Sequence, residues 1–180
     1  MSFNWQYFCM IKNFVGFILI YILVGSVHAQ NTGSPCACCT DEYKQLDFWI
    51  GDWVVYSGGQ MVGFNKITKI EADCVLRENW KSQVSSHSGT SYNFYDKNLR
   101  KWRHIWIGSD GISLDVRGDF KDKKMVMISD EIVDEKLNRV INKITWYNNP
   151  DGTVRQIWEQ SKDGGLAYST QWDGLYRRRK

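Results

Sequence analysis

Short β-rich runs, separated by polar or glycine-bearing segments, make up the chain from about residue 50 onward. This succession is typical of an all-β barrel or sandwich, and the short separators are typical of hairpin connections. No stretch of ten or more residues after position 50 keeps a helical periodicity. We predict strands near 52–57, 62–70, 74–83, 90–96, 101–108, 112–120, 124–130, 138–147, 153–161 and 167–178.

A meander of about ten antiparallel strands avoids open edges most simply by closing on itself. We therefore expect an up-and-down antiparallel β-barrel. The segment just before it, "DEYKQLDFWI" at residues 41–50, begins with acidic residues and contains several apolar ones. This pattern predicts one or two helical turns at the N-terminal side of the barrel.

Tryptophan alternates with polar or ionisable residues on one face of three of the predicted strands. The three faces comprise Leu76, Glu78 and Trp80; Trp102, His104 and Trp106; and Gln156, Trp158 and Gln160. Alternate side chains of a strand share a face. A face that mixes tryptophan with polar groups is typical of a ligand-holding barrel rather than of a dry sandwich core.

The first 29 residues have the three-part pattern of a secretory signal: one lysine, an apolar run over residues 14–24, and Val27-His28-Ala29 before a cut. An uncleaved anchor is the alternative, but the run is shorter than the ~20 residues that span a bilayer. We expect a signal peptide at 1–29, a cysteine-bearing arm at 30–45 and one barrel domain at 46–180. The protein is then exported, periplasmic or extracellular, with no stable membrane insertion after cleavage.

Charge gives little support for nucleic acid as a partner. The formal net charge is +3, and it falls to +2 without residues 1–29, which hold one lysine and no acidic residue. Basic residues are scattered, except for "RRRK" at the C-terminus. We expect a monomer or weak oligomer that does not bind nucleic acid.

Four cysteines follow the predicted cleavage site: Cys36, Cys38, Cys39 and Cys74. An even number in an exported chain suggests disulfides, with three connectivities open. We favour a bridge from one of the first three to Cys74, which would fix the arm to the barrel. A soft-metal thiolate site is the alternative, although "CACC" lacks the usual zinc spacing. We expect no metal and no cofactor.

Gly51-Asp52-Trp53, directly before the first strand, resembles the Gly-x-Trp signature of lipocalins and their calycin relatives. In those families an arginine from the last strand packs on the tryptophan. Arg177 or Arg178 stands where that partner would come from, and of the two we name Arg177 as a structural residue.

A longer series of motifs covers residues 46–178: "FWIGDW", "ENW", "SYNFYD", "KWRHIWI", "DGTVRQIWEQSKDGG" and "YRR". Taken in this order, they resemble a family of secreted, mostly bacterial domains of unknown function with a calycin-like barrel. The resemblance implies a fold and no established reaction.

The function that we expect is binding of a small hydrophobic or amphipathic molecule inside the barrel. The predicted ligand-binding residues are Glu78, Trp80, Asn93, Trp102, His104, Trp106, Trp158 and Gln160, with Trp146 and Trp172 as further candidate walls. Binding is favoured over catalysis because no nucleophile–base pair is identifiable. The alternatives are an isomerase or hydrolase that uses Glu78 and His104 as acid and base, and an interaction module whose barrel is filled by tryptophan.

Two residues of this set have competing interpretations. His104 could be a core histidine, a hydrogen-bond partner of a ligand, or an axial haem ligand. Glu78 on an apolar face would have a raised pKa unless it is paired. If its strand face were reversed, Arg103, Arg117 or Arg155 could pair with it.

Overall fold

The structure, a computed structural model, describes residues 36–180. The predicted signal peptide and the first residues of the predicted arm lie outside this range. The described chain begins with a helical turn α1 (Asp41–Lys44) and a 3₁₀ turn η1 (Asp47–Trp49). Eleven strands follow: β1 (Gly51–Ser57), β2 (Gln60–Ile70), β3 (Val75–Ser82), β4 (Ser88–Asp96), β5 (Lys101–Gly108), β6 (Ser113–Lys121), β7 (Lys124–Ile128), β8 (Ile132–Val133), β9 (Arg139–Asn148), β10 (Val154–Ser161) and β11 (Ser169–Arg178).

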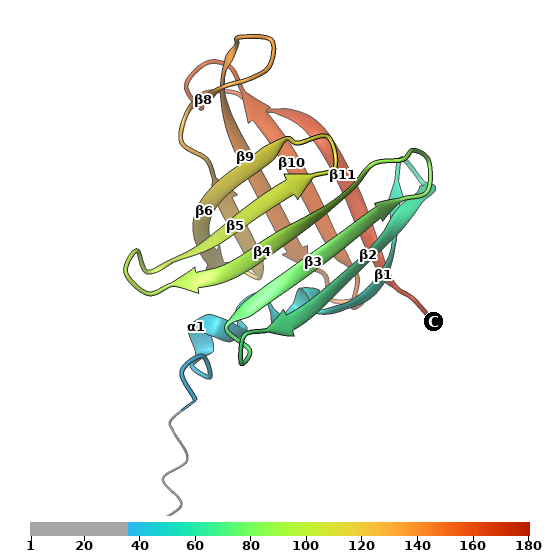
Figure 1. Ribbon diagram of the computed structural model, residues 1–180, viewed down its shortest axis with the longest axis vertical. Coiled ribbons are helices and arrows are strands. Elements are labelled where there is room, and N and C mark those ends of the chain that lie inside the picture. The colour runs from blue at the N-terminus through green and yellow to red at the C-terminus, as the bar shows by residue number, and fades with distance from the viewer. Residues whose placement is uncertain (1–35) are drawn as a thin grey trace, which may run out of the picture. The chain divides into compact units, whose positions relative to one another are not determined.

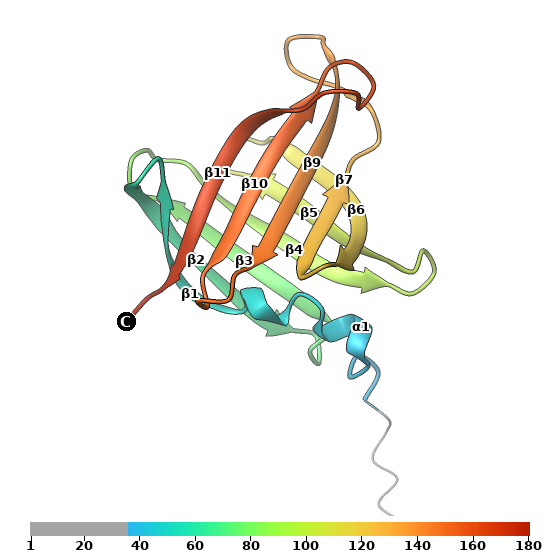
Figure 2. The same ribbon diagram turned by 180° about the vertical axis from the view of Figure 1, so that it is seen from behind.

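Ten of these strands form a closed antiparallel barrel (Figures 1 and 2). Each strand pairs with its neighbour in the chain, except that β7 pairs with β9 across β8. The ring closes where β11 pairs with β1. This confirms the predicted fold and all ten predicted strands. The one strand that the sequence pattern missed is β8, a two-residue strand that pairs only with β9, outside the ring.

The two ends of the barrel differ. Figures 1 and 2 show α1 and η1 at one end, here called the closed end, and β8 with its adjoining loops at the other, called the open end. At the closed end, Leu46 and Trp49 from the helical segment are fully buried. The Trp49 ring lies 5.5 Å from that of Trp146 and 6.1 Å from that of Tyr176, centroid to centroid. The apolar core therefore plugs this end of the barrel.

The Gly-x-Trp motif lies in this plug. Trp53 is completely buried, and its indole N–H donates to the Trp49 carbonyl at 2.8 Å. The Arg178 guanidinium lies 4.1 Å over the Trp53 ring and donates to the Ile50 carbonyl at 2.7 Å. Gly51 has a φ of +147°, and a Cβ there would lie 2.0 Å from the Arg178 Nη1. A glycine is therefore required for the arginine to approach this closely.

The choice of Arg177 as the structural arginine is wrong. Trp53 pairs with Arg178 in the β1–β11 register, so the two side chains share the inner face, as does Tyr176. Arg177 is one residue out of phase, and its guanidinium lies over Tyr56, 5.1 Å from the ring centroid.

Two disulfides hold the arm. Cys38–Cys74 ties the segment before α1 to the turn between β2 and β3, which confirms the favoured pairing, and Cys36–Cys39 closes a small loop. Because all four sulfur atoms are in disulfides, the alternative of a thiolate metal site is wrong. Disulfides are typical of oxidising compartments. None of the helices among residues 36–180 has the length and apolar character needed to cross a bilayer.

Removing the Cys38–Cys74 bridge with paired serine substitutions is expected to lower the free energy of unfolding by about 3 kcal/mol. The bridge closes a separation of 36 residues, and the entropy that a cross-link removes from the unfolded chain grows with loop length. The matched control is the paired serine variant of Cys36 and Cys39, which closes a separation of only 3 residues. Urea unfolding without reductant measures both, and equal losses would contradict this account.

Candidate ligand-binding cavity

A cavity of about 750 Å³ occupies the barrel interior between the core plug and the open end. This volume lies within the range of pockets that hold small organic molecules. Its apolar wall comes from six strands and consists of Trp80, Trp106, Leu114, Val140, Ile144, Trp158 and Trp172. The Trp80 and Trp172 rings meet edge to face, 5.8 Å apart.

The tryptophans line the wall without filling the space. A Cβ at Gly89 would lie 2.2 Å from the Trp106 ring, so that indole packs closely against the backbone of the neighbouring strand. Glycine at this position of β4 is what allows the close approach.

Polar side chains form the floor of the cavity, above the core plug. They are joined by hydrogen bonds into one chain that runs through Gln156, Tyr176, Asn65, Glu78, Ser91, Asn93 and His104. Six strands contribute to it, namely β10, β11, β2, β3, β4 and β5. The members of this chain that line the cavity itself are Glu78, His104, Gln156 and Tyr176.

His104 is held in one tautomer. Its Nδ1 lies 2.7 Å from the Asn93 Oδ1. The Asn93 amide nitrogen donates to the Leu76 carbonyl at 3.2 Å and to the Ser91 hydroxyl at 2.8 Å, so its oxygen is the acceptor and the His104 Nδ1 carries the proton. Burial lowers the pKa of His104 to about 3, against a smaller opposing effect of Asp115. The ring is therefore neutral, and its Nε2 lone pair has no hydrogen-bond partner among residues 36–180.

Glu78 is buried, and no cationic side chain in residues 36–180 pairs with it. Its carboxyl oxygens accept hydrogen bonds from the Ser91 hydroxyl at 2.6 Å and from the Asn65 amide at 2.5 Å. Burial raises the pKa of Glu78 to about 7, and the two hydrogen bonds oppose that rise. The group therefore changes its protonation near neutral pH.

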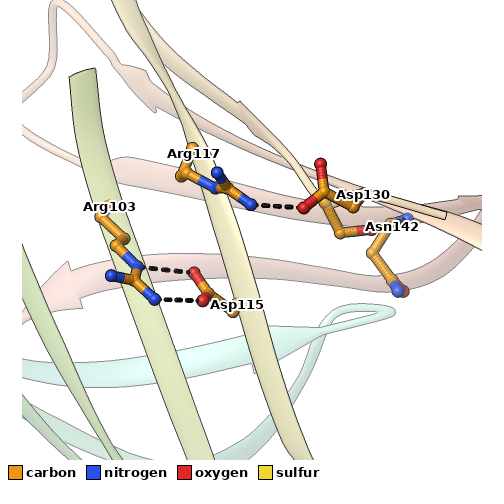
Figure 3. Close-up of polar contacts among 6 residues, drawn as sticks. Arg103, Asp115, Arg117, Asp130 and Asn142 are labelled. Carbon is orange, nitrogen blue, oxygen red and sulfur yellow. Dashed lines mark hydrogen bonds and ion pairs between the residues drawn. The ribbon is translucent and has the colours of Figure 1, made fainter. Parts of the chain in front are cut away.

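The arginines considered as partners of Glu78 lie on the outer face of the barrel. Arg103 binds Asp115 through Nε at 3.0 Å, and Arg117 pairs with Asp130 (Figure 3). Arg155 donates two hydrogen bonds to the Asp173 carboxylate, through Nε at 2.8 Å and through Nη2 at 2.6 Å. The predicted inward orientation of Glu78 is thus confirmed, and the reversed strand face is wrong.

The other end of the polar chain offers a donor. The Tyr176 hydroxyl donates to the Gln156 Oε1 at 2.5 Å, which leaves the Gln156 amide N–H groups directed at no partner among the described residues. Burial, followed by the nearby Glu78 charge, raises the pKa of Tyr176 well above its ordinary value. The floor thus presents an acceptor at His104, a carboxyl group at Glu78 and a donor at Gln156.

Most of the predicted ligand-binding residues lie together. The ones that line the cavity are Glu78, Trp80, His104, Trp106, Trp158 and Gln160. Asn93 is completely buried and lies behind the floor, where it orients His104. The further candidate wall Trp172 also lines the cavity.

Trp102 and Trp146 do not line the cavity, contrary to prediction, and both belong to the core plug. Trp102 shares the inner face of β5 with His104 but lies one residue pair closer to the closed end. Its indole N–H donates to the Glu42 carbonyl and to the Gln45 side chain, both at 3.1 Å. Strand alternation identifies the residues that point into the barrel. It does not show where along the barrel axis the core plug ends and the cavity begins.

Sequence reasoning did not single out Gln156 and Tyr176 as site residues. The signal for Gln156 was available, because it shares a strand face with Trp158 and Gln160. Tyr176 contacts Glu78 only through Asn65, which is 111 residues away in the sequence. No local pattern could have joined these positions.

The proposed acid–base pair is only indirectly connected. Glu78 and His104 line the same cavity. No direct hydrogen bond joins them, since the contact runs through Ser91 and Asn93. The enzyme hypothesis requires the two groups within hydrogen-bond reach, so the floor favours binding over proton transfer between them.

Comparison of the chain with protein-family models and with curated proteins found no match. The inferences about function therefore rest on the geometry and chemistry of the cavity.

Proposed function

We propose that the barrel binds a small hydrophobic or amphipathic molecule in its interior. The observation that carries this proposal is a cavity of about 750 Å³ with an aromatic wall and a hydrogen-bonded polar floor. Burying apolar ligand surface against such a wall is favourable by about 25 cal/mol per Å². The polar floor would fix the orientation of the head group.

The individual binding roles follow from position. Trp80, Trp106 and Trp158 would contact the apolar body of the ligand. Glu78 and His104 would contact its polar head, and Asn93 would hold His104 in place. A barrel filled by tryptophan is not supported, because the tryptophans leave the interior open.

We also propose that the protein works outside the cytoplasm, in a periplasm or in the extracellular space. The two disulfides support this location, because they persist in oxidising compartments. The N-terminal signal pattern in the sequence points the same way.

The neutral fluorescent probe 1-aminoanthracene tests the binding proposal. Its emission is expected to rise on entering the cavity, with saturation at one probe per protein. In Leu114→Arg, a charged side chain replaces part of the apolar wall. The affinity for the probe is therefore expected to fall about tenfold, which corresponds to the free energy of burying about two methylene groups.

The matched control is Ile105→Arg, which places the same side chain on the outer face of the adjacent strand. It is expected to bind the probe like the unmodified protein. If both arginine variants weaken binding equally, or if neither does, the probe does not occupy the interior.

A further inference from the structure

The floor of the cavity carries an acidic group that has no counter-charge in the part of the chain that the structure describes. Glu78 is 3 % exposed, and its hydrogen-bond partners are an amide and a hydroxyl. A buried carboxylate in a protein is ordinarily paired with a cation, because removing a lone charge from water is costly. Here the position opposite the carboxylate is the cavity itself.

Within residues 36–180, no positive side chain lines the floor. His104 and Tyr176, the other titratable groups there, are neutral at ordinary pH. Among the described residues that line the cavity, the lysines are Lys136 and Lys162, in the loops beside β9 and after β10 at the open end. An anionic head group at the floor would therefore meet Glu78 without any compensating charge.

The wall above Glu78 is suited to a cation. The cavity-lining tryptophans are Trp80, Trp106, Trp158 and Trp172. The face of an indole ring is the strongest aromatic attractor of a cation, and the attraction increases when water is excluded. Four indoles in the same cavity as one buried carboxylate would favour an organic ammonium group over a neutral or an anionic head.

The rim of the cavity also carries more acidic than basic side chains. The lining residues include Asp110, Asp134 and Glu135 at the open end, so that with Glu78 four carboxyl groups stand against two lysines. The Asp110 carboxylate lies 3.3 Å from the His87 imidazole. A predominantly acidic entrance raises the local concentration of cations.

We propose that the ligand of the cavity is an amphipathic amine, whose ammonium group binds Glu78 and the His104 Nε2 while its apolar body lies among the tryptophans. An ammonium group has only donors to offer, and these two groups are acceptors. This inference rests on the proposed function of the cavity and adds the chemical class of the head group.

The test is competition against 1-aminoanthracene by three compounds with the same eight-carbon chain: octylammonium, 1-octanol and octanoate. At pH 8, octylammonium is expected to bind at least tenfold more tightly than 1-octanol, and octanoate more weakly than either. In Glu78→Gln the preference for the amine over the alcohol is expected to fall below about twofold, because the carboxylate charge is removed.

The pH dependence of the unmodified protein tests the same proposal without a variant. Octylammonium stays protonated between pH 6 and 8, whereas Glu78 changes from mostly neutral to mostly ionised. If only the carboxylate binds the amine, octylammonium affinity should rise about tenfold across this range, and 1-octanol affinity should not change. In His87→Gln, which removes the rim histidine that stacks on Trp106, the rise of octylammonium affinity relative to 1-octanol affinity is expected to persist.

The outcomes separate the two proposals. Equal affinity for the amine and the alcohol, or tighter binding of octanoate, would overturn the amine proposal and leave the cavity as a binding site. A pH dependence that disappears in His87→Gln would also overturn it, because the rim would then be responsible. Failure of 1-aminoanthracene and of all three compounds to bind would overturn the proposed function and the amine together.

Discussion

Replacing Trp53 with alanine is expected to lower the free energy of unfolding by about 4 kcal/mol, as for other large-to-small changes at fully buried aromatic positions. Trp53 has no exposed surface, and the change removes its hydrogen bond to the Trp49 carbonyl and its contact with Tyr176. It also leaves a cavity beneath the Arg178 guanidinium. Urea unfolding followed by far-ultraviolet circular dichroism measures the effect.

Two arginine variants test whether Arg178, rather than its neighbour Arg177, stabilises the Gly-x-Trp motif. Arg178→Ala is expected to cost about 1–2 kcal/mol, because it removes a cation–π contact and a hydrogen bond to the Ile50 carbonyl. Arg177→Ala, one residue away on the outer face, should cost no more than about 0.5 kcal/mol. Similar losses in the two variants would contradict the assignment of Arg178 as the partner of Trp53.

The second large effect is a change in the pH dependence of stability when Glu78 or His104 is replaced. His104 is neutral when folded, with a pKa of about 3, and it takes up a proton below about pH 6.5 when unfolded. Stability from this residue is therefore lost as the pH falls from 6.5 toward 3. Glu78 has a folded pKa of about 7 and a lower one when unfolded, so its contribution is present below about pH 4.5 and is lost as the pH rises toward 7.

Between about pH 4.5 and 6.5 these two slopes oppose each other, each at about 1.4 kcal/mol per pH unit, and they cancel in the unmodified protein. In Glu78→Gln only the histidine slope remains, so stability should rise by roughly 2–3 kcal/mol from pH 4.5 to 6.5. In His104→Gln it should fall by a similar amount. Both variants are compared with the unmodified protein by urea unfolding at pH 4.5, 5.5 and 6.5.

The difference between the two variants is the informative quantity, because other titrating groups contribute equally to both. It should change by roughly 5 kcal/mol over two pH units, given the two opposite slopes. If the variants keep parallel profiles, then the two side chains are not buried in the protonation states assigned to them.

Local patterns in the sequence were sufficient to predict the strands. Their alternation and the polar turns between them are properties of neighbouring residues, so all ten barrel strands and the inward faces of Glu78, His104 and Trp158 were predictable. The strand β8 was not, because two residues carry no periodicity, and its pairing with β9 depends on where the loop returns.

Properties that depend on register or depth were harder to predict. Arg177 and Arg178 are adjacent, and only the pairing of Arg178 with Trp53 decides which one faces inward. Trp102 and Trp106 have the same strand phase, yet one lies in the core plug and the other on the cavity wall. The polar chain of the floor joins six strands, so no single segment of the sequence contains its pattern.

We propose that a small molecule occupies the cavity between the tryptophan wall and the polar floor. The most direct test is a crystal structure with 8-bromooctylammonium, whose bromine is located by anomalous scattering. We expect a bromine peak inside the barrel among Trp80, Trp106 and Trp158, with the ammonium group next to Glu78. A bromine peak only on the outer surface, or an interior closed by side chains, would contradict it.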